Sequence, residues 1–299
     1  MTIQRAVGAI WKNRATMEGA GVRLHRVFGN EQVPRLDPFL MLDDFGSDNP
    51  ADYVAGFPWH PHRGIETVTY LERGTVEHGD SIGNTGAIGP GDVQWMTAGS
   101  GIIHQEMPQA PADRILRGFQ LWVNLPAASK MCDPRYRGIE AAGIPSVTLS
   151  AGVTAKVIAG EAAGVKGPVK DLMVDVSYLD VRAAPKAACN HAVAANHRCL
   201  AYIVDGEGTF AGTRVGEGHV VLFEGSGAVP VAASPRGCRY LLFSGQPLGE
   251  PVAWYGPIVM NTEEELETAF REYRDGTFVK VGAARFGKAR AGINPAPTT

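Results

Sequence analysis

Short runs of β-branched and aromatic residues recur along the chain, and clusters of Gly, Pro, Asp and Asn separate them. Runs of this length and composition, with turn residues between them, are typical of sandwiches and barrels of antiparallel strands. The pattern therefore predicts an all-β protein. The clearest predicted strands are residues 67–71, 92–96, 119–123, 200–204, 219–223 and 240–243.

A helical pattern occurs near the end of the chain. Thr262 and Glu265 have the spacing of a capping box, in which each residue satisfies a backbone N–H near the other. An apolar stripe at helical spacing follows, and Gly276 is predicted to end the helix. The stripe consists of Leu266, Ala269, Phe270 and Tyr273. We therefore expect one short C-terminal helix.

A weak internal repeat suggests how the strands are grouped. Three segments of the first half resemble segments of the second half in the same order, at offsets of 132, 127 and 121 residues: 70–75 with 202–207, 90–93 with 217–220, and 119–122 with 240–243. Such a repeat predicts two similar β-barrels in tandem. We place the boundary near residue 140, so that residues 1–140 form the first barrel and residues 141–299 form the second barrel, the helix and a tail.

Composition narrows the function. The 299 residues suit two domains. The 28 basic and 31 acidic residues give a net charge of −3, which offers no basic excess for direct nucleic-acid binding. We expect no signal peptide and no transmembrane helix. The four cysteines include no CxxC pair, which favours reduced thiols and a cytoplasmic location, although a Cys189–Cys199 bridge remains open.

Two pairs of polar residues carry the candidate chemistry. Residues two apart on a strand point to the same side, so His60 and His62 would present both imidazoles to one face. His104 and Glu106 repeat this spacing. A lone histidine is usually structural, but two such pairs on neighbouring strands predict a metal site. Three imidazoles and one carboxylate suit Fe, Mn, Co, Ni, Cu or Zn and leave coordination positions open.

Glu66 is an alternative to Glu106 as the carboxylate ligand. It follows His62 by four residues and therefore shares the parity of the two histidines. It could equally accept a hydrogen bond that orients an imidazole. We rank Glu106 first. Arg63 has the opposite parity, which favours a surface position or a loop anchor over a catalytic role.

The pattern H-x-H-x3-E, followed by a Pro-Gly pair and a further His, resembles the cupin superfamily. The segments 56–64, 94–108 and 256–262 are similar to the pirin family specifically, and the resemblance covers nearly the whole chain. It implies two tandem cupin (jelly-roll-like) barrels with one metal in the first. The metal is usually iron, so we expect Fe(II). The family's ligands fall on His60, His62, His104 and Glu106, which leaves Glu66 outside the ligand set.

The second barrel is expected to hold no metal. The repeat offsets align the four ligands with residues that cannot bind an ion: Ala192, Ala194, Val231 and Ala233. We interpret the nearby His191, His197 and His219 as structural or surface residues. One divalent metal per chain is therefore expected.

Several pirins resemble quercetin 2,3-dioxygenases, which cleave flavonols with dioxygen and release carbon monoxide. The resemblance implies a small aromatic substrate, with Glu106 as the base that accepts the proton of its hydroxyl. Apolar residues near the motifs are candidates for the pocket wall, although ordinary barrel packing explains them better: Phe57, Trp59, Trp95, Met96 and Met107.

Other functions fit the same residues. Some pirins are described as transcriptional co-regulators, so the metal could control binding to a protein partner, and a nuclear location would then be consistent. A purely structural metal is a third hypothesis, but structural sites usually close their coordination with Cys and His. The resemblance also implies a monomer.

Overall fold

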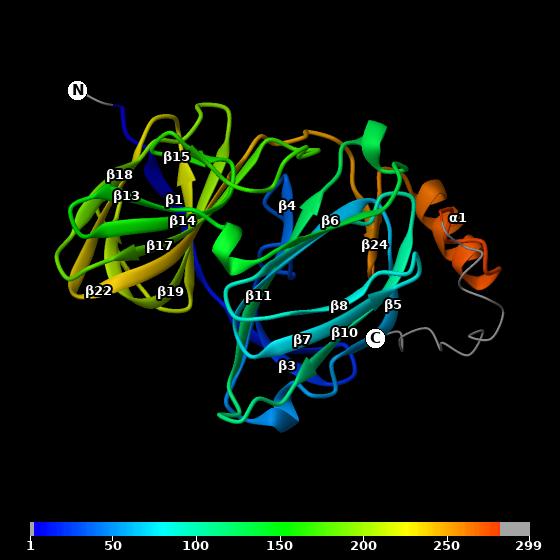
Figure 1. The fold of residues 1–299 in the computed structure, drawn as a ribbon. Helices are drawn as coiled ribbons and strands as arrows, with labels where there is room; N and C mark the ends of the chain where they lie inside the picture. Colours follow the sequence, from blue (N-terminus) through cyan, green and yellow to red (C-terminus); the bar gives the residue numbers. More distant parts are fainter. Residues whose placement is uncertain (1–2, 282–299) are drawn as a thin grey trace.

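Burial alternates along several strands of the computed structural model, which describes residues 3–281. Along β10 (Ile102–Gln109), every second side chain from Ile102 to Pro108 is buried. Each such strand contributes one row of side chains to a barrel interior and another to its outer face. The result is two jelly-roll-like barrels side by side (Figure 1), which confirms the predicted all-β class and the two tandem barrels.

The first barrel consists of two sheets. The larger sheet has the order β12 (Arg135–Ile139), β9 (Val93–Thr97), β6 (Ile65–Arg73), β11 (Leu116–Asn124), β4 (Phe39–Ser47), β3 (Val22–Phe28), β2 (Arg14–Glu18). The smaller sheet has the order β5 (Phe57–His62), β10, β7 (Thr75–Asp80), β8 (Thr85–Ile88).

The second barrel is one nine-stranded sheet. Its main order is β1 (Ala6–Lys12), β21 (His219–Glu224), β19 (Arg198–Phe210), β22 (Val229–Gly245), β17 (Val176–Ala183), β14 (Val153–Ala159), β13 (Ser146–Ser150). In addition, β18 (Ala188–His191) pairs with β22, and β20 (Thr213–Gly216) pairs with β19. The short strands β15 (Glu161–Ala162) and β16 (Val165–Lys166) form a separate hairpin. The 3-10 turns are η1 (Pro50–Asp52), η2 (Ala127–Ser129) and η3 (Ala141–Gly143).

The two barrels share a core. One cluster of buried side chains contains Trp95 and Phe119 from the first barrel and Tyr178 and Phe243 from the second. A buried polar network crosses the same contact. Arg239 of β22 donates to both carboxylate oxygens of Asp180 at 2.9 and 3.0 Å and also contacts Glu72 of β6, while the Tyr70 hydroxyl donates to Asp180 at 2.8 Å.

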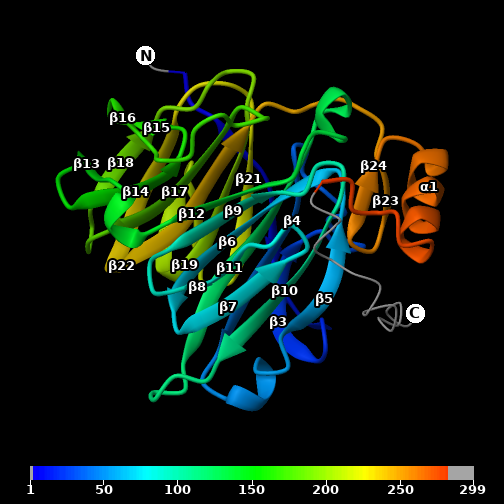
Figure 2. The same cartoon turned by 45° about the vertical axis from the view of Figure 1, so that its right-hand side comes forward.

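Each end of the chain packs against the barrel that the opposite half of the sequence forms. The N-terminal strand β1 pairs with β21 of the second barrel. After β22 the chain returns to the first barrel, where it forms β23 (Ala253–Tyr255), β24 (Ile258–Met260) and helix α1 (Glu263–Arg274) beside the first barrel's sheets (Figure 2). Thr262 caps α1 in the predicted capping box with Glu265. Each barrel therefore depends on residues from the far end of the sequence.

Two further expectations concern cysteines and membranes. All four cysteines are free in the structure, so Cys189 and Cys199 are not bridged. Within residues 3–281, α1 is the one α-helix, and it is far too short and polar to cross a membrane.

Candidate metal centre

The two histidine pairs meet on neighbouring strands, as their spacing predicts. Strand β5 pairs with β10 in antiparallel register, which places His60 opposite His104 and His62 opposite Ile102. Residues opposite one another on paired strands share a face, so all three imidazoles point into the first barrel. The ring centroids lie 4.4 to 5.0 Å apart. Within residues 3–281, these three are the one group whose metal-ligating atoms all lie within 4.8 Å of one another.

Each imidazole is held by a hydrogen bond at Nδ1. Nδ1 of His60 donates to the Pro58 carbonyl at 2.9 Å, and Nδ1 of His62 donates to the Pro257 carbonyl at 3.0 Å. A carbonyl oxygen only accepts, so in the neutral ring Nε2 is left with its lone pair. His104 is held at Nδ1 by the Tyr136 hydroxyl at 2.9 Å. This outer hydrogen bond is the usual way in which proteins orient a metal-binding histidine.

The Nε2 atoms make a site that suits a cation. Nε2 of His60 and Nε2 of His62 lie 3.1 Å apart, and Nε2 of His104 is buried with no hydrogen-bond partner in the described part of the chain. Burial lowers the pKa of His60 to about 4 and holds the pKa of His62 and His104 well below the usual range. Protons are therefore disfavoured, and lone pairs this close repel unless a cation lies between them. These three residues can hold a metal ion.

Glu106 faces the same interior from β10, two residues beyond His104. The β5–β10 register shifts between these residues, so Glu106 lies opposite Phe57. Its carboxylate accepts hydrogen bonds from the Thr69 hydroxyl at 3.0 Å and from the Gln120 amide at 3.4 Å, and it lies outside the imidazole group. Burial raises the pKa of Glu106 to about 7, against the effect of these two donors. Its role as a fourth ligand stays a prediction.

Glu66 points away from the imidazoles, so the parity argument for it is wrong. Gly64, with φ of 77°, makes the turn between β5 and β6 and restarts the alternation. Glu66 accepts a hydrogen bond from Thr97 at 2.6 Å and lies 3.7 Å from Arg137. Arg63 is 2% exposed, so it is a buried anchor and not a surface residue.

Several residues around the histidines were not predicted from the sequence, because they belong to no short motif. Tyr136 orients His104 and stacks on His78 with parallel rings whose centroids lie 5.5 Å apart. His78 is opposite Glu106, and its Nδ1 is buried with no hydrogen-bond partner among residues 3–281. Trp122 meets His62 edge to face at 5.0 Å, and its indole N–H likewise has no partner in this part of the chain.

One of the proposed wall residues serves ordinary packing, since Trp95 is fully buried in the core between the barrels and not in the first barrel's interior. Met96 belongs to a buried cluster against which Trp122 and Tyr136 pack. Packing is therefore the correct explanation for Trp95, whereas Met96 lies beside side chains that contact the histidine group.

The second barrel shows what replaced the ligands. Its strand pairing sets Cys189 opposite Val231 and His191 opposite Val229, the registers that His60 and His62 occupy in the first barrel. The repeat offset of 132 therefore missed the equivalent pair by three residues. His191 Nε2 lies 2.7 Å from the Tyr240 hydroxyl and 3.4 Å from Cys189 Sγ, so the group satisfies itself by hydrogen bonding.

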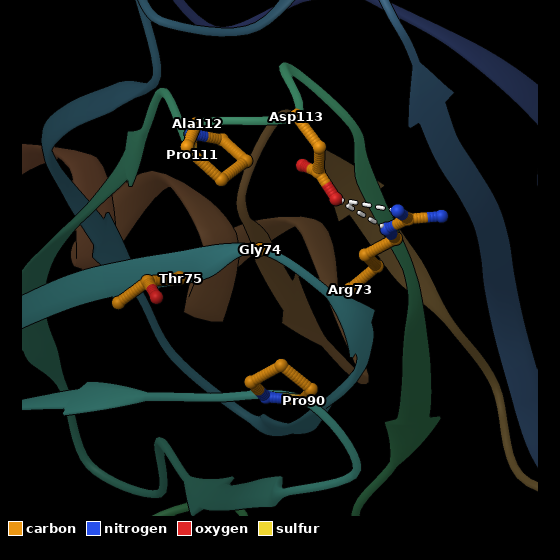
Figure 3. A pocket seen from close by; sticks show the side chains of 7 residues that line it. All are labelled: Arg73, Gly74, Thr75, Pro90, Pro111, Ala112 and Asp113. Atoms are coloured by element: carbon orange, nitrogen blue, oxygen red, sulfur yellow. Dashed lines mark hydrogen bonds and ion pairs between the residues drawn. The ribbon is translucent and has the colours of Figure 1, made fainter.

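A shallow surface cavity of about 430 Å³ lies far from the imidazoles (Figure 3). It lies at the C-terminal end of β6, between the turn at Gly74 and the segment from Pro111 to Asp113. Arg73 and Asp113 form an exposed ion pair beside it, 2.5 Å long. None of the residues that line this cavity belongs to the histidine group.

Two barrels of this kind, with three histidines inside the first that can hold a metal ion, define a cupin protein with two cupin domains. Residues 21–123 match the Pirin family model, and residues 178–279 match the model of the Pirin C-terminal cupin domain. The chain belongs to the pirin family. The proposed boundary near residue 140 lies between the two matches and stays a prediction.

Similar proteins carry the names that the resemblance implied. A Pseudomonas aeruginosa protein provisionally named quercetin 2,3-dioxygenase is 44% identical over 283 residues, which cover 92% of this chain and 99% of the relative. Human Pirin is 40% identical over 271 residues, 88% of this chain and 90% of Pirin. A crystal structure of quercetin 2,3-dioxygenase from Acinetobacter baumannii matches with a TM-score of 0.85 and 33% identity, covering 92% of this chain and 99% of that chain.

Proposed function

We propose that this pirin is a metal-dependent dioxygenase that cleaves flavonol-like substrates in the manner of quercetin 2,3-dioxygenase. The observation that carries the proposal is the convergence of three neutral imidazoles, each fixed at Nδ1, in the first barrel. The names of the P. aeruginosa and A. baumannii relatives support the reaction class. In this proposal one divalent ion, Fe(II) by preference, is held by His60, His62 and His104, with Glu106 as the fourth ligand.

A bound divalent ion would supply Lewis-acid stabilisation of an enolate and open positions for substrate and dioxygen. The protein's own residues do the rest. In this proposal Glu106, a buried carboxylate that faces the interior beside Thr69, accepts the proton of a substrate hydroxyl. Trp122 and His78 offer an indole N–H and an imidazole nitrogen for which the described residues provide no partner. These atoms would orient a polar substituent on a flat ring.

The test combines elemental analysis with a turnover assay on one preparation. The Fe(II)-loaded protein should remove flavonol absorbance from quercetin in air and release carbon monoxide. His104→Ala should lose both the metal and the activity, whereas the control His219→Ala should keep both, because His219 lies on the second barrel and bonds to backbone carbonyls. A fully metallated protein that turns over neither quercetin nor close analogues would rule out this substrate class.

A further inference from the structure

The segment that follows the second barrel touches the candidate metal centre directly. This C-terminal segment, residues 253–279, contains β23, β24 and α1. The hydrogen bond that fixes the His62 ring comes from it, because the acceptor at 3.0 Å is the carbonyl of Pro257 between the two strands. A second contact runs through aromatic rings, since Trp254 packs 6.1 Å from Trp122, which itself meets the His62 ring. One metal-binding imidazole is therefore oriented from about 195 residues away in sequence.

Arg63, the residue after His62, fastens this segment to the barrel. Its guanidinium donates to the Glu272 carboxylate on α1 at 2.7 Å and to the Phe278 carbonyl at 3.0 Å, and it lies 4.3 Å over the Phe278 ring. The backbone contributes as well, because the Val259 N–H donates to the Arg63 carbonyl at 3.1 Å. A charge-assisted hydrogen bond from a buried guanidinium is among the stronger contacts available to a protein.

Lys130 closes the same junction from the other side. Its ammonium is buried and donates to three acceptors: the carbonyls of Gly64 and Val259 at 2.9 and 3.1 Å, and the Asn124 side chain at 2.7 Å. The chain approach is close enough that a Cβ on Gly64 would come within 1.9 Å of the Val259 carbonyl oxygen. The turn after the histidine pair and strand β24 are therefore fitted to each other.

We infer that Arg63 is a positioning residue for the metal centre, acting on His62 through the C-terminal segment. The ion pair between Arg63 and Glu272 keeps α1 docked, and the docked segment keeps the Pro257 carbonyl beside His62. That carbonyl fixes the proton on Nδ1 and directs the Nε2 lone pair inward. Without the Pro257 hydrogen bond the imidazole can rotate or exchange tautomers, and metal affinity falls. The inference rests on the proposed metal site but not on the proposed substrate.

The decisive variants weaken the helix contact without touching a ligand. Glu272→Ala removes the partner of Arg63 from a half-buried helix position, and Arg63→Gln removes the charge itself. Glu267→Ala is the matched control, because Glu267 is an exposed glutamate of the same helix whose side chain forms no ion pair or hydrogen bond with residues 3–281. Loss of an outer hydrogen bond to a ligand typically weakens metal binding 10- to 100-fold. We expect about tenfold weaker Ni²⁺ binding for Glu272→Ala in competition with a chelator, more for Arg63→Gln, and none for Glu267→Ala.

A spectroscopic readout separates positioning from general loosening. In the Zn²⁺-loaded protein, the His62 Nδ1–H should give a slowly exchanging imidazole NMR signal that broadens or disappears in Glu272→Ala. Hydrogen exchange in α1 should slow when Zn²⁺ binds, because linkage makes the coupling reciprocal. Unchanged affinity in both variants, or an α1 exchange rate indifferent to metal, would overturn the inference. If the wild type binds no metal, the proposed site fails first, and if it binds metal without turning over quercetin, only the proposed reaction fails.

Discussion

Replacing Arg239 with Met removes the cation that joins the two barrels. The Arg239 and Asp180 side chains are 6% and 1% exposed, and the two residues form a bidentate pair. Burial acts to raise the pKa of Asp180, but the hydrogen bonds and charge of Arg239 outweigh it and hold that pKa below its usual value. In Arg239→Met the carboxylate keeps the hydrogen bond from the Tyr70 hydroxyl, at 2.8 Å, and the charge of Arg182.

The expected loss follows from the uncompensated charge. Removing one partner of a buried pair costs about 3–5 kcal/mol, and the remaining Tyr70 donor places this variant near 3 kcal/mol. The sign of the pH dependence also follows. A carboxylate with a lowered folded pKa adds stability above its unfolded pKa, and this contribution is lost as the pH falls through the folded pKa. Because burial then dominates Asp180 in the variant, its destabilisation should diminish as the pH falls from 7 towards 4.

Urea unfolding of Arg239→Met, followed by tryptophan fluorescence and circular dichroism at several pH values, measures both effects. The control Arg214→Met removes an exposed cation of the same barrel, from a side chain that is 76% exposed, and should leave the unfolding midpoint unchanged. Arg239→Met combined with Asp180→Asn should recover most of the loss. A cost below about 1 kcal/mol at pH 7, or a cost that does not change with pH, would refute the reasoning.

Three further predictions concern the metal centre and its surroundings. His62→Ala should abolish metal retention, whereas Glu66→Gln should keep most of it, and elemental analysis showing the reverse would exchange their roles. Burial lowers the pKa of Lys130 to about 8. As the pH rises, the folded protein therefore releases this proton before the unfolded chain does, and the free energy of unfolding should rise between about pH 8 and 10. Urea unfolding of Lys130→Met should not show this rise. Gly64→Ala should destabilise the protein by at least about 2 kcal/mol more than Gly249→Ala in the same assay. Both glycines have a positive φ, which costs an alanine about 1–2 kcal/mol, but of the two only Gly64 faces a close backbone atom. Equal costs would contradict the close fit of Gly64 to β24.

The histidine group was predictable because strand alternation is a local rule. It placed His60, His62 and His104 on one face, and the strand pairing confirms that they meet. The same rule failed for Glu66, because the turn at Gly64 intervenes and alternation does not continue through a turn. A glycine directly after H-x-H-R was the available signal for that break.

The partners of the ligands were not predictable, because they come from distant parts of the chain. No pattern near His62 indicates Pro257, and no spacing rule links Arg63 with Glu272. The repeat had a related limit. The offset between His60 and Cys189 is 129, smaller than the 132 of the segment that follows, so the repeat could not locate Cys189 and His191 until the pairing of β18 with β22 was known.

The packing of each chain end against the opposite barrel has a consequence for synthesis on the ribosome. The last proposed ligand, Glu106, is made about 151 residues before Pro257, the residue whose carbonyl orients His62. At about 5–20 residues per second, roughly 8–30 seconds separate the two. During that interval the nascent first barrel holds every proposed ligand but lacks the outer support of one of them. The proposed centre therefore gains the outer support of His62 only after Pro257 has been made, well after every proposed ligand.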